Sequence, residues 1–443
     1  MKTFRLFLAC TFIFFFAGSL FGESITSLQL QATKLLYDAK RDKIYAIVNG
    51  SDSLYGNSFV QINPQNNKIE RSIFIGSEPN CMDITKDTNY VYVALGGASY
   101  IKRVDLQRFQ IDQTIALPLH FVSPIFASPI FASDIATVSL SPDLVVVSLE
   151  TVSTSPKFRG VVAYYKESLL PAFIQGHTGA NVIESATDTN LIFGYNLETS
   201  GDDFYRMNVD TVTGVNLIDK TRISLGSASN FMYRGNHIYT NSGEIIDPYL
   251  EKPAIVKELS FHAQNIEIDT KKGYAFLGTI SYNVLKIDYF DLNTQQMTYQ
   301  KSFVDVIPPD YSLGEITEII RFGDDGLAMI IRDYYHDFNT RRVLFFKSSF
   351  VLSTKGNDSK YTIASYPNPV SDYLTLNLNL DKECKIAYHV YDIQGKLFIS
   401  DRFIGQLGEN QKKIAFHNLT NGIYVISVQI DGKNTEQVKI IKQ

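Results

Sequence analysis

The side chains that could carry acid, base or metal chemistry are scattered along this sequence rather than grouped in a motif. No His-Glu-x-x-His pair, Gly-x-Ser-x-Gly elbow, phosphate-binding glycine loop or Cys-x-x-Cys pair occurs. The seven histidines show no metal-ligand spacing. The sequence therefore predicts no cofactor and no metal, and no motif identifies a catalytic residue.

Acidic groups gather at two places that could attract Ca²⁺, which prefers several oxygen ligands. These are the aspartate pairs at 202–203 and 324–325, and neither has enough further ligands nearby in the sequence. Solvated turn aspartates are the interpretation we favour. The densest mixture of acidic, basic and aromatic groups, residues 332–337, has no partner motif. Whether the protein is an enzyme stays open at this level.

The elements that would have to position such groups form an internal repeat. One unit has strand patterns at 36–38, 43–48, 59–63 and 69–73, with a polar turn after the first, and the next unit repeats them from residue 82. About seven copies follow one another at the ~40 to 50 residue spacing of four-stranded propeller blades. No long apolar stripe of helical period occurs, which fits an all-β chain. An array of β-sandwiches is the alternative.

The second unit carries the most distinctive sequence of the repeat. It reads Tyr-Val-Tyr-Val-Ala-Leu-Gly-Gly over residues 90–97, directly after a polar turn. This pattern resembles the YVTN class of bacterial seven-bladed β-propellers, over roughly residues 25–352. The resemblance implies a closed ring of blades around a central channel.

Blade topology predicts which surface carries function. Loops between the second and third strands of a blade share one face with the connections between blades, and a rigid scaffold positions such loops for recognition. We call this the loop-rich face; its longest segments are 49–57, 150–159, 198–203, 333–341, 118–133 and 305–313. Aromatic groups dominate interface energetics. The predicted ligand-binding anchors are therefore Tyr55, Phe126, Phe131, Tyr311, Tyr334 and Tyr335.

One connection between blades contains a tandem pentapeptide, Ser-Pro-Ile-Phe-Ala, over residues 123–132. A strand ladder is not expected to run through its prolines. If it is exposed, its phenylalanines form an apolar patch of the kind that marks an interaction site. The alternative is that the segment folds over a blade edge and joins the core.

The N-terminus and the charge balance indicate export. Lys2 and Arg5 precede an apolar run at 6–16 and small residues up to Gly22, the layout of a cleaved signal peptide over 1–22. The run is shorter than the ~20 residues that span a bilayer, although a membrane anchor is the alternative. Its removal takes two of 41 basic residues and none of 46 acidic ones, so the formal charge changes from −5 to −7. That charge disfavours nucleic acid as a partner.

Four blocks at the C-terminus form a second targeting signal, at 365–376, 389–397, 418–426 and 438–443. Their distinctive residues are Pro367, Asn368, Pro369, Asp392, Gly395, Gly422, Tyr424 and Lys439. In this order they resemble the type IX secretion system C-terminal sorting domain, also called the Por secretion system, of Bacteroidetes proteins. The resemblance implies recognition by the type IX machinery and passage through the periplasm to the outer-membrane surface or the medium. An accessory sandwich without a secretory role is the alternative.

Together these patterns predict an all-β protein, a seven-bladed β-propeller followed by a small C-terminal Ig-like β-sandwich. The expected divisions are a signal peptide at 1–22, the propeller at 23–352, a linker at 353–364 and the sorting domain at 365–443, with the N-terminal strand and 342–346 closing the ring. The predicted function is recognition of a protein or glycan. The alternatives are a secreted lyase or hydrolase with its site at the central channel, and a structural role in the surface layer.

Overall fold

The computed structural model describes most of the 443-residue chain as two compact units, residues 1–349 and 350–443. The described residues are 24–123, 126–152, 155, 157–175, 179–187, 189–198, 201–226, 228–281, 284–303, 314–332, 340–347, 361–380, 382–392, 396–431 and 433–443. The predicted signal peptide and most of the predicted linker lie outside them.

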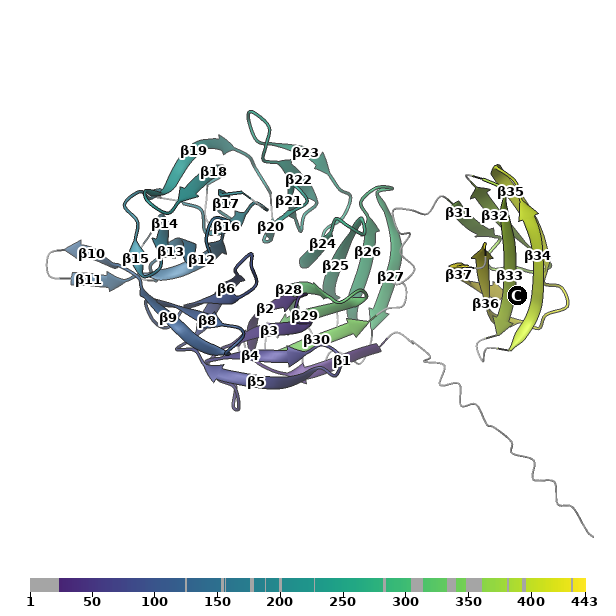
Figure 1. Cartoon of the computed structure of the whole chain (residues 1–443), viewed down its shortest axis with the longest axis horizontal. Coiled ribbons are helices and arrows are strands. Elements are labelled where there is room, and N and C mark those ends of the chain that lie inside the picture. Colours follow the sequence, from purple (N-terminus) through teal and green to yellow (C-terminus); the bar gives the residue numbers. More distant parts are fainter. Residues whose placement is uncertain are drawn as a thin grey trace, which may run out of the picture. The chain divides into compact units, whose positions relative to one another are not determined.

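Within the described part of the first unit, seven four-stranded antiparallel sheets follow one another around a ring (Figure 1). Blades 1 to 3 consist of β2 (Ala32–Asp38), β3 (Lys43–Val48), β4 (Ser58–Asn63) and β5 (Lys68–Phe74); β6 (Pro79–Ile84), β7 (Tyr90–Leu95), β8 (Tyr100–Asp105) and β9 (Gln110–Ala116); and β12 (Phe131–Thr137), β13 (Leu144–Glu150), β14 (Phe158–Tyr165) and β15 (Ser168–Leu169). Blades 4 to 6 consist of β16 (Val182–Ser185), β17 (Leu191–Tyr195), β18 (Asp203–Asp210) and β19 (Gly214–Arg222); β20 (Phe231–Arg234), β21 (His237–Thr240), β22 (Glu244–Asp247) and β23 (Ala254–Glu258); and β24 (Asn265–Asp269), β25 (Tyr274–Ser281), β26 (Val284–Asp291) and β27 (Gln296–Phe303). Blade 7 consists of β28 (Glu315–Phe322), β29 (Gly326–Arg332), β30 (Arg341–Lys347) and β1 (Ser24–Gln29). The predicted all-β propeller is confirmed.

The blades pack face to face, and this explains their sequence pattern. Second strands such as β3 and β7 are almost wholly buried because both faces meet a neighbouring blade, so they read as runs of β-branched and aromatic residues. Outermost strands such as β5 and β9 are mostly exposed and polar. The hydrophobic cores accordingly lie between blades: one core joins Ile44 and Val60 of blade 1 to Ile330 and Val343 of blade 7.

The ring closes by pairing of its two ends. Strand β1 runs antiparallel to β30 from Ser24 opposite Lys347 to Gln29 opposite Arg342. The N-terminal strand thus supplies the outermost position of blade 7, as the sequence predicts (Figure 1). Blade 1 then packs on blade 7 as every other blade packs on the one before it. Opening the ring would expose apolar faces of both blades to water.

The proline-containing connection between blades 2 and 3 differs from the prediction. It forms an antiparallel hairpin of β10 (Leu119–Ser123) and β11 (Phe126–Pro129), which extends outward from the ring in Figure 1. Pro129 is the last residue of β11 and lies opposite Leu119, so its missing N–H falls at the end of the short ladder. The sequence did not predict this hairpin, but its ladder does not continue through a proline, since β10 ends at Ser123 and Pro129 is the last residue of β11.

The C-terminal unit is a sandwich of two antiparallel sheets. One contains β31 (Tyr361–Tyr366), β32 (Tyr373–Leu380) and β35 (Gly408–Ala415), and the other contains β33 (Cys384–Asp392), β34 (Leu397–Gly405), β36 (Gly422–Ile430) and β37 (Lys433–Lys442). Alternate residues of β32, from Leu374 to Leu380, pack with Val390, Ile426 and Ile440 of the opposite sheet in one core. Strand β31 begins four residues before the predicted start of the sorting domain at residue 365.

Several residues of the predicted sorting motif fasten this sandwich. The Asn368 amide donates to the Lys439 carbonyl oxygen at 2.7 Å, and its oxygen accepts from the Ile441 N–H at 2.9 Å, so Asn368 ties the first block to β37. Tyr424 is buried, and its hydroxyl donates to the Thr420 carbonyl oxygen at 2.9 Å. The remaining motif residues have separate placements: Pro367 and Pro369 follow cis peptide bonds, Asp392 ends β33, Gly422 begins β36, and Gly395 lies outside the described residues.

Ring closure leads to a testable stability difference. Deleting residues 24–29 should lower the melting temperature of the secreted protein by about 10 °C or more, because β30 loses its only outer partner and the blade 7 core loses cover. Excising 120–128 and joining the ends with two glycines should change it by less than about 2 °C, because Leu119 and Pro129 already lie opposite each other. Differential scanning calorimetry measures both. Equal shifts for the two deletions would contradict this role of β1.

Candidate functional site

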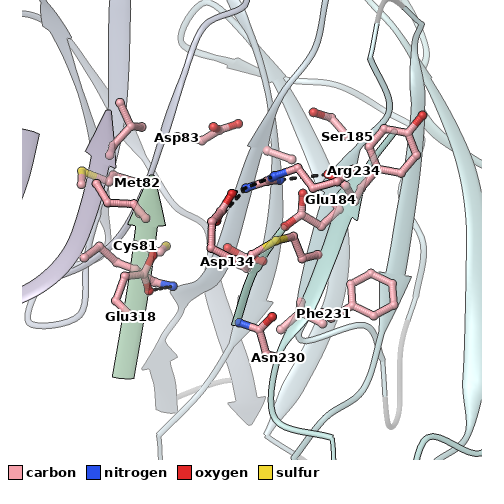
Figure 2. Close-up of a pocket in the computed structure, with 18 of the residues that line it drawn as sticks. Cys81, Met82, Asp83, Asp134, Glu184, Ser185, Asn230, Phe231, Arg234 and Glu318 are labelled. Carbon is pink, nitrogen blue, oxygen red and sulfur yellow. Dashed lines mark hydrogen bonds and ion pairs between the residues drawn. The ribbon is translucent and has the colours of Figure 1, made fainter. Parts of the chain in front are cut away.

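The innermost strand of each blade places a charged side chain on the central channel. Together these side chains line a cavity of about 580 Å³ that is bounded by all seven blades (Figure 2). In blade order they are Lys34, Asp83, Asp134, Glu184, Arg234, Glu267 and Glu318. Lys86, from the turn after β6, and Arg321 of β28 also line it. A volume of this size is within the range of small-molecule and cofactor pockets.

Some of the ring charges pair with the neighbouring blade. Lys34 Nζ lies 2.9 Å from Glu318 Oε2, which joins blade 1 to blade 7, and the Glu318 carboxylate raises the pKa of Lys34 well above its usual range. Arg234 Nε lies 3.3 Å from Glu267 Oε1, which joins blade 5 to blade 6. Each pair neutralises charge that would be costly to leave buried alone. These residues therefore hold the inner ring together.

Two aspartates bond to neighbouring backbone instead of to cations. Asp83 Oδ2 accepts from the Thr137 N–H at 2.7 Å and from its hydroxyl at 2.8 Å, which ties blade 2 to blade 3. Asp134 Oδ2 accepts from the Ile183 N–H at 2.8 Å, which ties blade 3 to blade 4. Burial nevertheless raises the pKa of Asp134 to about 6. Above that pH this carboxyl is ionised while it remains bonded to backbone.

Glu184 is the exception in the ring. Among the described residues, no group hydrogen bonds to its carboxyl, and it forms no ion pair. The side chain is partly exposed to the cavity, as Figure 2 shows, yet protein surrounds it. Burial raises the pKa of Glu184 to about 8, although Arg234 acts in the opposite direction. At neutral pH Glu184 is therefore protonated, whereas its neighbour Asp134 is ionised.

A lysine crosses one end of the channel. Lys86 Nζ donates to the Ser185 hydroxyl at 2.7 Å, so a turn of blade 2 reaches the innermost strand of blade 4. Lys86 and Thr187 lie in turns between first and second strands, whereas Ser229 and Asn230 precede β20 on the loop-rich face. The cavity thus extends from the crossed end to the loop-rich end. In the described residues, no group of three His, Cys, Asp or Glu side chains is placed to hold a metal ion.

The predicted loop-rich anchors have varied placements. Tyr55, in the loop after β3, is partly buried and packs against the core between blades 1 and 7. Phe131 begins β12 and is only 8% exposed, so it is a packing residue and not a surface anchor. Phe126 begins β11, but its side chain is outside the described part, as are all atoms of Tyr311, Tyr334 and Tyr335. The two anchors with described side chains, Tyr55 and Phe131, lie in blades 1 and 3.

Sequence reasoning missed the channel residues. The available signal is a charged residue inside each first strand, such as Asp83 in Met-Asp-Ile or Glu267 in Ile-Glu-Ile. A period-two pattern places such a residue on the face opposite its apolar neighbours. Only closure of the ring makes that face a shared cavity, because Lys34 and Glu318 are 284 residues apart in the chain.

Comparison with known proteins agrees with both units. Residues 364–443 match the secretion system C-terminal sorting domain. This segment is a sorting domain. It indicates export by the type IX system to the cell surface or the medium, and it implies interaction with that secretion machinery. No helix in the described residues is long and apolar enough to cross a membrane.

The propeller unit is similar to solved propellers at low sequence identity. The β-propeller domain of Cps50 (Swd1) from Myceliophteria thermophila is 11% identical, with a TM-score of 0.49, and the match covers 74% of this chain and 100% of that one. U3-55K is also 11% identical, with a TM-score of 0.48 and coverage of 73% and 98%. No curated protein matches the sequence. The fold assignment rests on the strand pairing described above.

The raised pKa of Glu184 predicts a pH-dependent effect of its replacement. Below pH 4.5 the Glu184 carboxyl is protonated in the folded and unfolded chains, so its ionisation does not affect stability. Between pH 4.5 and about 8 the unfolded chain ionises first, so stability falls as pH rises through this window. Glu184→Gln should therefore melt like the unmodified protein at pH 4.5 and several degrees, roughly 4 to 10 °C, higher at pH 8.5.

The matched control is Glu258→Gln, which alters an exposed glutamate on the outer strand β23. It should shift the melting temperature by the same small amount at both pH values. Thermal melts followed by circular dichroism give the comparison. A Glu184→Gln shift that is independent of pH would show that this carboxyl is ionised throughout.

Proposed function

We propose that this protein is an exported recognition propeller that binds an extracellular protein or glycan at its loop-rich face. The observation that carries the proposal is the exposure of large apolar side chains on that face. Leu54 is 82% exposed in the loop between β3 and β4, and Val152 is 68% exposed in the loop after β13. Both belong to loops between second and third strands, which rigid, fully packed blades hold in place.

The channel gives a second support, because its cavity reaches the same face. Ser229 and Asn230, in the connection before β20, line its loop-rich end, and so does Leu197 from the loop after β17. A ligand held by the loops would therefore lie over the channel entrance. A protein or glycan partner fits a face that combines apolar loop tips with a polar central hollow.

An enzyme is the second candidate, favoured by one observation. Asp134 and Glu184 lie on adjacent innermost strands, and burial raises the pKa of Asp134 to about 6 and that of Glu184 to about 8. At neutral pH one carboxyl can accept a proton and the other can donate one, which is the pairing that acid–base catalysis requires. A lyase or hydrolase of this kind would release cleaved product, whereas a binding protein would return its ligand intact.

The loop-rich face can be tested with matched surface variants. The mature full chain is first probed on glycan and protein arrays, and affinity for the best ligand is then measured by surface plasmon resonance. The double variant Leu54→Ser, Val152→Ser should weaken binding by about thirtyfold, since interface apolar groups of this kind contribute roughly 1 kcal/mol each.

The control is Leu140→Ser, Val212→Ser, which removes two exposed apolar groups from turns on the opposite face. Leu140 is 51% exposed between β12 and β13, and Val212 is 76% exposed between β18 and β19. Affinity should stay within about twofold of the original. If the control variant lost binding and the Leu54→Ser, Val152→Ser variant did not, the ligand would bind the face opposite the loop-rich face, which would contradict the proposal.

Export depends on the sorting domain in this proposal. A chain that ends at residue 363 should fold its propeller, since that unit has its own closed ring, yet remain in the periplasm of the native host. Fractionation and immunoblotting measure the distribution, and the full chain is the control. Equal amounts of the two chains at the surface or in the medium would contradict a sorting role for residues 364–443.

A further inference from the structure

One half of the channel carries carboxyl groups that no cation contacts directly, although Lys34 acts on Asp134, and Arg234 and Lys86 act on Glu184, at longer range. Asp83, Asp134 and Glu184 come from the innermost strands of three consecutive blades, and none of them forms an ion pair in the described structure. In the other half, Lys34 pairs with Glu318, and Arg234 pairs with Glu267. The channel is thus divided into a neutralised side and an acidic side. Buried charge without a partner is unfavourable, so the acidic side favours an added positive charge.

Two polar groups that line the cavity, one on this side and one on the adjoining blade 5, also lack partners. Glu184 has no hydrogen bond among the described residues, and the side-chain oxygen of Asn230 is buried without a donor. Asn230 lies toward the loop-rich end of the cavity, as Figure 2 shows. Both groups are hydrogen-bond acceptors once Glu184 is ionised. A ligand with several N–H donors would supply the hydrogen bonds that Glu184 and the Asn230 oxygen do not receive from the protein.

The wall between these two groups is apolar. Residues on the same strand face as the ring charges, two positions nearer the loop-rich end, are Cys81, Val182 and Met232. Two residues of a strand span about 6.6 Å, which is comparable to the reach of a four-carbon stem. Lysine side chains lay such stems along apolar surface and present the ammonium group beyond it. The wall therefore suits an aliphatic stem better than a sugar ring covered with hydroxyl groups.

A metal ion fits this half poorly. Among the described side chains, no three of the metal-ligating types are placed to coordinate one ion. An ammonium group needs only separate acceptors, because its three N–H donors can point to different carboxylates. The cation that matches the spacing is therefore an organic one.

We propose that the acidic half of the channel binds the primary ammonium group of a lysine-like side chain, with Glu184 as its ionic partner and the stem along Val182 and Met232. The ligand enters from the loop-rich end, where Asn230 lies, while Lys86 bonds to Ser185 at the other end. The site does not depend on the loop-face recognition proposed above. It would accept a lysine of a peptide or of a folded partner protein.

Proton release accompanies binding at this site. The groups that face Glu184 are Arg234 from β20, Asp134 from β12, Asp83 from β6 and Lys86 from the turn after β6. Burial holds the pKa of Glu184 at about 8 in the empty channel, and an ammonium group at its side favours the ionised form. Affinity should therefore rise with pH, by up to about tenfold per unit between pH 6.5 and 8, and level off above it.

Isothermal titration calorimetry of the full mature chain tests the proposal with Nα-acetyl-lysine methylamide as the probe. Nα-acetyl-norleucine methylamide, which has a similar stem without the ammonium group, is the matched control and should not bind. Glu184→Gln should weaken lysine binding at least tenfold at pH 8 and remove the pH dependence. Leu54→Ser, Val152→Ser should leave it unchanged, which separates this site from the loop face.

Four results would overturn the proposal. They are equal binding of the lysine and norleucine probes, no binding of the lysine probe at pH 8, binding of glucosamine in place of the lysine probe, and an unchanged pH dependence in Glu184→Gln. Thermal melts of that variant establish that it is folded. Asp134→Asn provides a second variant, which should weaken binding but keep the rise with pH, because Glu184 remains.

Discussion

Pairing of β1 with β30 is the interaction on which the rest of the propeller depends. It joins residues 24–29 to residues 342–347 and places blade 1 against blade 7. Without it, two blades would expose faces of β-branched and aromatic residues that elsewhere lie between neighbours. The central channel exists only because this contact returns the chain to its start. Every property of the channel is therefore a consequence of closure.

Most of the charged side chains that line the channel bond to a neighbouring blade, and one of them, Glu184, does not. Lys34, Asp83 and Asp134 each bond to an adjacent blade, so the inner strands are tied by polar contacts where apolar packing cannot fill the centre. Glu184 has no such role and remains at the cavity with a raised pKa. A carboxyl that does not stabilise the fold, yet is held in place by it, is suited to contact a ligand.

The C-terminal unit is stabilised differently from the propeller. Its core is shared between two small sheets, and Asn368 fastens the first block of the predicted motif to β37 at the end of the chain. The blocks that mark the sorting domain in sequence thus meet in one structure. The domain indicates the route of export.

The sequence by itself determined the seven blades, the closing strand and the C-terminal sandwich, because period-two patterns and turns are local signals. It also determined the sorting domain, whose four blocks follow one another in order at the end of the sequence. Only the tertiary structure decided the candidate site, because Lys34 and Glu318 meet across 284 residues and a charged residue in a first strand does not show which other residues share its cavity. It likewise decided that Phe131 is buried and that the proline segment forms a hairpin. Burial and pKa depend on neighbours that only the closed ring supplies.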